Sequence, residues 1–242
     1  MRKEAISKLH YVCGESRGVI LSNEDRFLKI GYNSIQENRE KLERFARQRR
    51  DFLLSFEPVK IREGPRVALL MADSAEAANV GPMAAVAGVL ADLAVEDMVN
   101  EGASLAVVEN GGEASVHTQD YVDVALRTGA TALSNRICFR IEEPSSGLAT
   151  SSGLHSHAFS LGEADAVTVF AENSGVADAA ATSVGNQIVG EDAPSIIKQG
   201  ITRALSIKGV HGVIVLYNEH YGVGGRVPKM IGVKSMNEVY IH

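Results

Sequence analysis

Ala166-Val-Thr-Val-Phe-Ala171 is a short β-rich run without a charge, and it predicts a buried strand. After a polar turn the chain continues as Ala177-Asp-Ala-Ala-Ala-Thr-Ser-Val184, whose small residues predict a helix. The alanines let another backbone or a ligand approach this helix closely. Asp178 and Thr182 are one helical turn apart, so their oxygens project from one face and can converge on a single point.

Two convergent oxygens suit a hard cation such as Mg²⁺, or a phosphate that carries one. Two structural explanations stay open for the same pair. The helix dipole favours an acid near the start of a helix whatever its function, and the Thr182 hydroxyl can hydrogen-bond back to its own helix. Asp178 and Thr182 are therefore candidate metal ligands that need support from elsewhere in the chain.

The composition is that of a globular protein: 242 residues, 45% hydrophobic and 22% charged. The formal net charge of -6 argues against a general nucleic-acid surface. Cys13 and Cys138 fit neither a metal-ligand spacing nor a disulfide framework, which favours a reducing compartment. We recognise neither a signal segment nor an apolar run of about 18 residues. We therefore expect a cytoplasmic protein with neither nucleic acid nor membrane as a partner.

Periodicity predicts the elements of the first half. Alternation over residues 11–32 predicts a two-stranded hairpin, and an amphipathic pattern predicts a helix over about 34–47. The Ala/Val-rich stretch 65–102 predicts two helices divided at Gly81-Pro82. A strand at 104–109 leads through Asn110-Gly-Gly, a strong hairpin signal, into 114–117. Arg44, Arg47, Arg49 and Arg50 could bind phosphate, but a solvated face with ion pairs explains them better.

The second half adds more strands and two histidines. We expect strands at 121–127, 133–142 and 212–217, a Ser/Gly-rich loop at 145–153, a helix at about 194–207 and a turn at 221–226. His155 and His157 follow the loop. Residues two apart on an extended segment face the same way, so the two histidines could bind a metal. Either could instead serve in acid–base chemistry, or in packing and hydrogen bonding.

The order of these segments resembles the ApbE family of flavin transferases, and particularly the shorter branch related to it. In that family an Asn-Gly-Gly-Asp turn, a Thr-Ser-Gly segment, a Ser-His pair and an Ala-Asp-Ala-x-x-Thr-Ala helix recur in this succession. Here an Ala/Gly-rich helix comes first, and the matching segments follow over roughly residues 80–190: Asn110-Gly-Gly-Glu113, Thr150-Ser-Ser-Gly153, Ser156-His157 and Ala177-Asp-Ala-Ala-Ala-Thr182.

The resemblance implies a magnesium-dependent enzyme that cleaves FAD, passes FMN to a threonine hydroxyl on an acceptor protein and releases AMP. Under it, Asp178 and Thr182 take the magnesium positions. His157 takes the place of the active-site histidine that helps to remove the proton from the attacking hydroxyl. The flavin nucleotide would lie beside two segments: Asn110, Gly111 and Gly112 in the turn, and Thr150, Ser151 and Gly153 after it.

The chain also departs from the family pattern. Ala87 stands where the family has the lysine of a Gly-Gly-Ile-Ala-Lys-Gly helix start, and Glu113 replaces the aspartate of the turn. The family's Ile-Asp-Pro-x-Thr-Gly segment after the histidine is absent. These differences keep two alternatives open. One is a non-catalytic flavin- or nucleotide-binding protein, and the other is a cofactor-biosynthesis enzyme that acts on another phosphorylated substrate.

We therefore expect an α+β fold in which residues 1–242 form a single ApbE-like domain. It would consist of two interleaved halves that divide near residue 120, with mixed sheets flanked by helices. A ligand cleft would form where the Asn110 turn meets the Asp178 helix. The alanine-rich helices and acidic composition also permit a homodimer.

Overall fold

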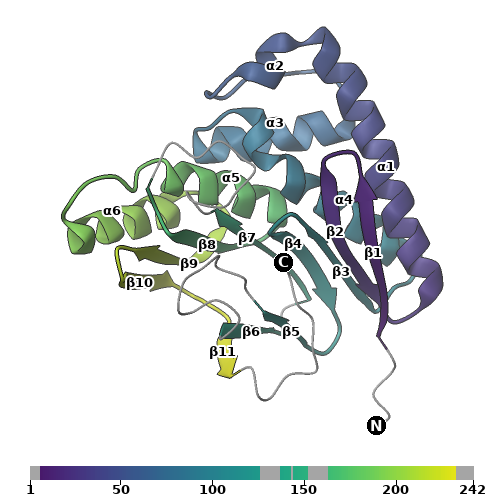
Figure 1. The fold of residues 1–242 in the computed structure, drawn as a ribbon. Helices are drawn as coiled ribbons and strands as arrows, with labels where there is room; N and C mark the ends of the chain where they lie inside the picture. Colours follow the sequence, from purple (N-terminus) through teal and green to yellow (C-terminus); the bar gives the residue numbers. More distant parts are fainter. Residues whose placement is uncertain (1–5, 126–136, 143, 152–162, 233–242) are drawn as a thin grey trace.

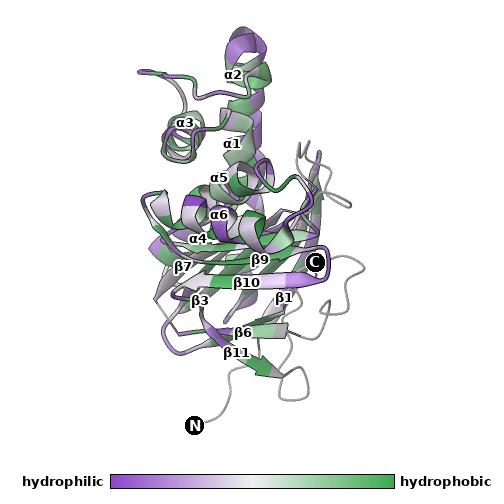
Figure 2. Cartoon of the chain, turned by 90° about the vertical axis from the view of Figure 1, so that its left-hand side faces the viewer, coloured by the Kyte–Doolittle hydropathy of each residue, from purple (hydrophilic) through white to green (hydrophobic). Residues whose placement is uncertain are grey.

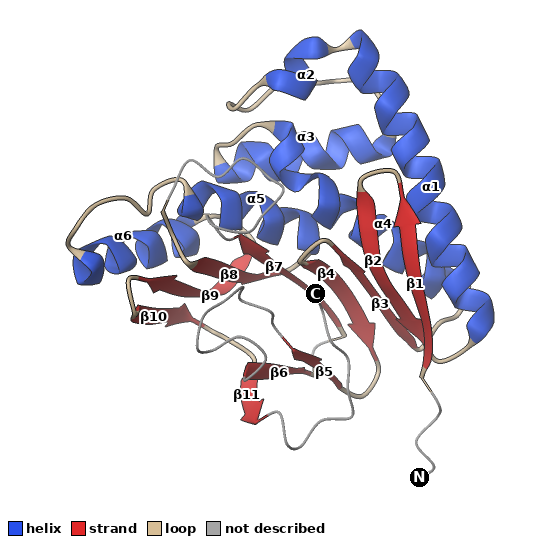
Figure 3. Cartoon of the chain, in the orientation of Figure 1, coloured by secondary structure: helices blue, strands red, loops and turns tan. Residues whose placement is uncertain are grey.

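The structure is a computed structural model that describes residues 6–125, 137–142, 144–151 and 163–232. Helices cover one face of an eight-stranded sheet, and a three-stranded sheet lies beneath the opposite face (Figures 1 and 3). Figure 2, turned by 90°, shows these layers from the side, with the helices above and β6 and β11 below. This layered arrangement confirms the predicted α+β class.

The large sheet has the order β1-β2-β3-β4-β7-β8-β9-β10, and the small sheet has the order β11-β6-β5. The strands of the large sheet are β1 (Ser7–Cys13), β2 (Ser16–Ser22), β3 (Leu105–Asn110), β4 (Glu113–Thr118), β7 (Ser145–Ser151), β8 (Ala166–Ala171), β9 (Val210–Tyr217) and β10 (His220–Gly225). Those of the small sheet are β5 (Val122–Ala125), β6 (Ile137–Ile141) and β11 (Lys229–Gly232). The helices are α1 (Asp25–Gln48), α2 (Arg50–Leu54), α3 (Arg66–Ala78), the 3₁₀ turn η1 (Pro82–Ala85), α4 (Val86–Asn100), α5 (Ser174–Gly185) and α6 (Ala193–Ser206).

The path of the chain through the large sheet occurs twice. β1 and β2 are followed by α1 to α4 and then by β3 and β4, and β7 and β8 are followed by α5 and α6 and then by β9 and β10. The two ββ-helix-ββ units meet where β4 pairs with β7, with Ala114 opposite Leu148. The small sheet takes its strands from segments outside these two units.

All strand pairs in the described residues are antiparallel, so the expectation of mixed sheets is wrong. Each helical excursion leaves the large sheet and re-enters it at the same end, next to the strand it left. A parallel pair would require a crossover to the opposite end. The helices therefore connect neighbouring antiparallel strands.

The main hydrophobic core lies between the helices and the large sheet and draws on both units. Leu42 and Val67 come from the first unit, whereas Val169, Val215 and Tyr217 come from the second. A second cluster, which includes Val107 and Phe139, fills the space between the two sheets. Other buried residues of α1 and α4, such as Ile35 and Met98, pack with β1 to β3 in a third cluster.

Three local predictions need correction. Residues 25–32 begin α1 instead of continuing a hairpin, because buried residues such as Phe27, Leu28 and Ile35 recur with helical spacing. The expected loop at 145–153 is strand β7 as far as Ser151. The expected turn at 221–226 is strand β10, in which a side chain at Gly222 would overlap Ile197 of α6. Glycine there reflects close packing of a helix on a strand.

Among the described residues, no single helix is long and apolar enough to span a membrane. Helix α3 and the segment Pro82–Asn100 meet the length and composition requirements only as a pair, and that pair is bent by 102°.

Candidate functional site

A cavity of about 660 Å³ lies at one end of the large sheet, where β1, β3 and β7 end and β2 and β4 begin. Helices α1, α4 and α5 complete its walls. Six residues predicted for the site line this cavity: Asn110, Gly111, Thr150, Ser151, Asp178 and Thr182. Gly112 is next to this group in the β3–β4 turn. Gly153 and His157, as well as His155, lie outside the described residues.

Helix α5 begins with a well-defined set of hydrogen bonds. The Asn173 side chain accepts the Val176 N–H at 2.8 Å, which caps the first turn. Asp92 of α4 accepts the N–H groups of Ser174 and Gly175 at 2.9 and 2.8 Å. A side chain at Gly88 would overlap the Ser174 carbonyl, so the first turns of α4 and α5 are in backbone contact. This contact fixes how α5 presents Asp178.

Asp178 is the fifth residue of α5, beyond the first turn of its own helix. Its carboxylate instead accepts the Gly88 N–H, in the first turn of α4, at 3.0 Å. Burial raises the pKa of the Asp178 carboxyl, the N–H groups of Gly88 and Ala87 lower it, and Asp92 raises it further. The carboxylate is thus at a helix N-terminus as the dipole explanation proposed, but at that of a neighbouring helix.

The Thr182 hydroxyl makes no hydrogen bond within the described part of the chain. The alternative that it bonds back to its own helix therefore does not hold in this structure. Its half-buried side chain lines the same cavity as Asp178. A hydroxyl without a partner among the described residues is available to a ligand.

The Asn110 turn is fixed against α4. Gly111 and Gly112 have φ angles of 76° and 117°, which explains why glycine occupies both positions. The Asn110 amide donates to the Ala87 carbonyl at 3.1 Å, and this bond ties the turn to the start of the helix. On the far side of the cavity, the hydroxyls of Thr150 and Thr168 are 3.0 Å apart across β7 and β8.

The sequence interpretation missed an acidic group, Glu109, at the end of β3. Glu109 is only 1% exposed, and its Oε1 accepts the Gly112 N–H at 3.0 Å. Its Oε2 is buried, and no described residue forms a hydrogen bond with it. Burial is the main reason that its pKa rises to about 7. A glutamate inside the apolar run Leu105–Asn110 was the available signal, because a charged residue in a buried strand requires an explanation.

Glu113 adds a second acid that the sequence analysis treated only as a replacement in the turn. Burial raises its pKa well above the usual value, and the charges of Asp178 and Glu109 raise it further. Glu109, Glu113 and Asp178 therefore share the lining of one cavity with a fourth acid, Glu15, which pairs with Arg39. A bound divalent cation would reduce their mutual repulsion.

The β1–β2 hairpin forms the opposite wall, which no local sequence pattern predicted. Tyr11 donates from its hydroxyl to the Glu109 carbonyl at 3.1 Å. Arg39 of α1 donates to Ser16 Oγ at 3.0 Å and also contacts Glu15 and Glu43. Arg17 of β2 lines the cavity as well.

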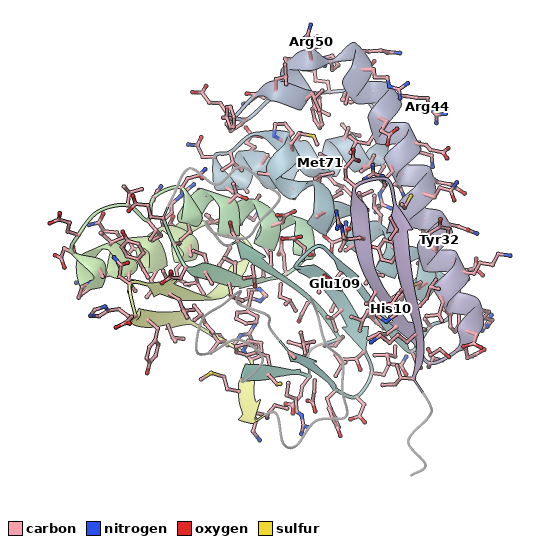
Figure 4. The ribbon with its side chains drawn as sticks, in the orientation of Figure 1. His10, Tyr32, Arg44, Arg50, Met71 and Glu109 are labelled. Atoms are coloured by element: carbon pink, nitrogen blue, oxygen red, sulfur yellow. The ribbon has the colours of Figure 1, made fainter. Side chains whose placement is uncertain are left out.

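The four other arginines singled out in the sequence lie away from this cavity. Figure 4 shows Arg44 and Arg50 pointing outward from the upper part of the molecule. Arg49 pairs with Asp51 at 2.7 Å, and Arg47 lies 3.8 Å from Glu43. The solvated, ion-paired surface is therefore the better explanation for these residues.

Comparison with known proteins identifies the family of this chain. The family model described as "AbpE bacteria" matches residues 2–206. The chain belongs to this family. A UPF0280 protein from Methanococcus maripaludis is 36% identical over 222 residues, which cover 90% of each chain. A UPF0280 protein from Methanocaldococcus jannaschii is 34% identical over 219 residues, which cover 88% of each.

Two solved structures share the fold. The flavinyl transferase ApbE from Pseudomonas stutzeri, in its apo form, matches with a TM-score of 0.59 and 11% identity, over 91% of this chain and 94% of that one. The ApbE protein from Thermotoga maritima matches with a TM-score of 0.52 and 13% identity, over 91% and 97%. At these identities the likeness concerns the fold, and it agrees with the expected relation to ApbE.

The residues that line the cavity fit a Mg²⁺ ion whose coordination is completed by a bound ligand. In the described part of the chain, no group of three or more His, Cys, Asp or Glu side chains is arranged to hold a metal. Mg²⁺ commonly takes only one or two carboxylates and fills its remaining positions with water and substrate phosphates. The Asp178 carboxylate and the Thr182 hydroxyl, which has no partner among the described residues, suit this mode of binding.

Proposed function

We propose that this protein is a cytoplasmic, magnesium-dependent transferase that cleaves FAD and passes FMN to a hydroxyl group of an acceptor protein. One observation carries the proposal. Residues of α5, the β3–β4 turn and β7 that were singled out from sequence line a single cavity of about 660 Å³. Membership of the family and the shared fold support the same activity.

Each part of the cavity has a role in this proposal. Asp178 and Thr182 hold Mg²⁺, which neutralises the charge that develops on the pyrophosphate oxygens. The Asn110 turn, Thr150 and Ser151 contact the flavin nucleotide. Because hydrogen bonds tie the turn to α4 and Thr150 to β8, these groups are preorganised before the ligand binds.

The transfer exchanges one phosphorus–oxygen bond for another. The acceptor oxygen bonds to the phosphorus of the FMN moiety, and the bond from that phosphorus to the AMP moiety breaks. AMP leaves with the bonding electrons, and the hydroxyl proton passes to a base. We assign the base role to His157, in keeping with the sequence pattern.

The first experiment measures AMP release from FAD by chromatography, with Mg²⁺ and with EDTA. We expect AMP with the wild type only when Mg²⁺ is present. Thr182→Val removes the hydroxyl and keeps the shape of the side chain, and we expect it to reduce AMP release at least about tenfold. Asp178→Asn should reduce it further, because it removes a charged metal ligand.

Thermal unfolding of both variants in EDTA is the control. Thr182→Val should unfold at the wild-type temperature, because the hydroxyl has no partner in the described residues. If Asp178→Asn unfolds early while Thr182→Val keeps full activity, then Asp178 is only the cap of α4 and the magnesium site is wrong. If the wild type releases AMP as fast in EDTA as it does with Mg²⁺, the magnesium site is also wrong.

A second candidate function is passive flavin or nucleotide binding. The segment formed by η1 and the start of α4 supports this candidate. Its residues Met83, Ala84, Val86 and Ala87 line the cavity, and none of these four has a cationic side chain. A binding protein of this kind would retain flavin after purification and release no AMP from FAD. AMP release from another nucleotide but not from FAD would instead indicate an enzyme for a different phosphorylated substrate.

A further inference from the structure

The lining of the cavity is electrically asymmetric. Glu109, Glu113 and Asp178 lie on the side formed by β3, β4 and α5. The side formed by the β1–β2 hairpin and α1 carries the basic side chains His10, Arg17 and Arg39. Figure 4 labels His10 on β1 and Glu109 on β3, and β2 runs between these two strands. The basic side chains of the lining therefore all come from the hairpin and α1, where Glu15 also lines the cavity and pairs with Arg39.

The Arg39 side chain already binds other residues of the protein. Its guanidinium contacts Glu15, lies 3.2 Å from Glu43 Oε1 and donates to Ser16 Oγ at 3.0 Å. Only 12% of its side chain is exposed. Two carboxylates compensate its charge, and the contacts with Glu15 and Ser16 secure the tip of the β1–β2 hairpin. Arg39 is thus a structural element of this wall.

Arg17 is in a different situation. It lines the cavity from β2, and its exposed side chain makes no hydrogen bond or ion pair within the described residues. It pairs across the hairpin with Val12, whereas His10 pairs with Val19. Arg17 and His10 are therefore diagonal neighbours on one face of the hairpin. An uncompensated guanidinium with a histidine beside it is suited to an anion.

We infer that Arg17, with His10 beside it, forms a phosphate-binding subsite at the hairpin wall of the cavity. This inference rests on the proposed function, in which the ligand is a dinucleotide with two phosphates. One phosphate faces the cation held by Asp178 and Thr182, and Arg17 binds the other. The planar guanidinium offers paired N–H donors that match phosphate oxygens. Ala87, at the start of α4, contributes no positive charge to the cavity, so a basic side chain of the hairpin binds this phosphate.

The test compares Arg17→Ala with Lys8→Ala, using the full-length chain with Mg²⁺. Lys8 is a matched control because it is an exposed cation on the same face of the same hairpin and does not line the cavity. Inorganic pyrophosphate binding is measured by calorimetry, and FAD and riboflavin binding by flavin fluorescence. Riboflavin carries no phosphate, so its affinity reports on the flavin contacts alone.

We expect Arg17→Ala to weaken binding of pyrophosphate and FAD by about tenfold or more. Riboflavin binding should stay within about twofold, and Lys8→Ala should change each affinity by less than about twofold. The affinity of Arg17→Ala for FAD should also depend less steeply on salt concentration, because one charge contact is missing. The thermal stability of Arg17→Ala should equal that of the wild type, since the Arg17 side chain has no partner in the described part of the chain.

The outcomes of these binding measurements distinguish the phosphate subsite from the proposed function. If Arg17→Ala binds pyrophosphate and FAD as tightly as the wild type, or loses riboflavin equally, the phosphate subsite is wrong whatever the enzyme does. If neither pyrophosphate nor FAD binds to the wild type, the subsite is wrong as well. If pyrophosphate binding depends on Arg17 but no flavin binds, the subsite stands and the flavin transferase proposal fails.

Discussion

At the scale of single residues, Glu109 is a carboxylic acid that the fold removes almost completely from solvent. One of its oxygens accepts the Gly112 N–H, and the other is buried without a hydrogen-bond partner in the described parts of the chain. Burial raises its pKa from 4.5 to about 7. Folding therefore favours the protonated form, and stability that is present below about pH 4.5 is lost as the pH rises to about 7.

We predict that Glu109→Gln removes most of this pH dependence. The shift corresponds to roughly 3 kcal/mol of unfolding free energy, because each pKa unit is worth about 1.4 kcal/mol. In EDTA, the variant should gain stability relative to the wild type between pH 4.5 and 7 and keep a constant advantage above that range. Urea unfolding at several pH values measures the difference. Glu40→Gln, on the exposed surface of α1, is the control. Parallel pH curves for Glu109→Gln and the wild type would contradict the prediction.

Residue identities in the site were only partly predictable from sequence. Asp178, Thr182, Asn110 and Thr150 stand in recognisable local patterns, and the structure brings them to one cavity. Arg17 lies in a stretch that reads only as an ordinary strand. Its place at the cavity depends on β2 pairing with β3, and a contact across more than 80 residues leaves no trace in local spacing.

At the scale of elements, the contact between α4 and α5 positions the site. Asp92 reaches from α4 to cap α5, and Asp178 reaches from α5 to cap α4. The two carboxylates are therefore reciprocal caps that join the first turn of each helix to the other helix. Small residues such as Gly88 are needed there because backbone touches backbone.

We predict that Asp92→Ala lowers the free energy of unfolding by about 1–3 kcal/mol, because two buried N–H groups lose their acceptor. It should also weaken Mg²⁺-dependent FAD binding, since α5 carries Asp178. Asp192→Ala is the matched control, because Asp192 caps the exposed start of α6 through one 3.4 Å bond. Urea unfolding and FAD titration give both results. Equal losses in the two variants would mean that Asp92 is an ordinary cap.

Elements with a clear period were predictable, and those defined by packing were not. Strand β8, helix α5 and the β3–β4 hairpin occur where the sequence placed them. Strands β7 and β10 were taken for a loop and a turn, because their serine and glycine content is typical of irregular segments. In β10 the glycines instead allow α6 to pack closely on the strand.

At the scale of the whole molecule, the main core contains residues from both ββ-helix-ββ units. Leu42 and Val67 of the first unit share this core with Val169 and Val215 of the second. Neither unit can therefore bury its apolar surface by itself. The expectation of two interleaved halves that divide near residue 120 stays a prediction, and this shared core supports it.

We predict that the chain unfolds in a single cooperative transition. Far-ultraviolet circular dichroism and tyrosine fluorescence should give superimposable urea curves; the chain contains no tryptophan, so the emission comes from its tyrosines. A variant that weakens one unit, such as Phe52→Ala at the buried residue of α2, should shift the whole transition to lower urea. Two resolved transitions, only one of which moves, would show that the units fold independently.

The seam between the units also passes through the cavity. Asn110 and Arg17 belong to the first unit, and Thr150, Asp178 and Thr182 belong to the second. A gene for either repeat would thus encode half of a site. If the chain were cut between β4 and β7 and supplied as two polypeptides, any activity would report their reunion, which makes this fold a natural starting point for a split reporter.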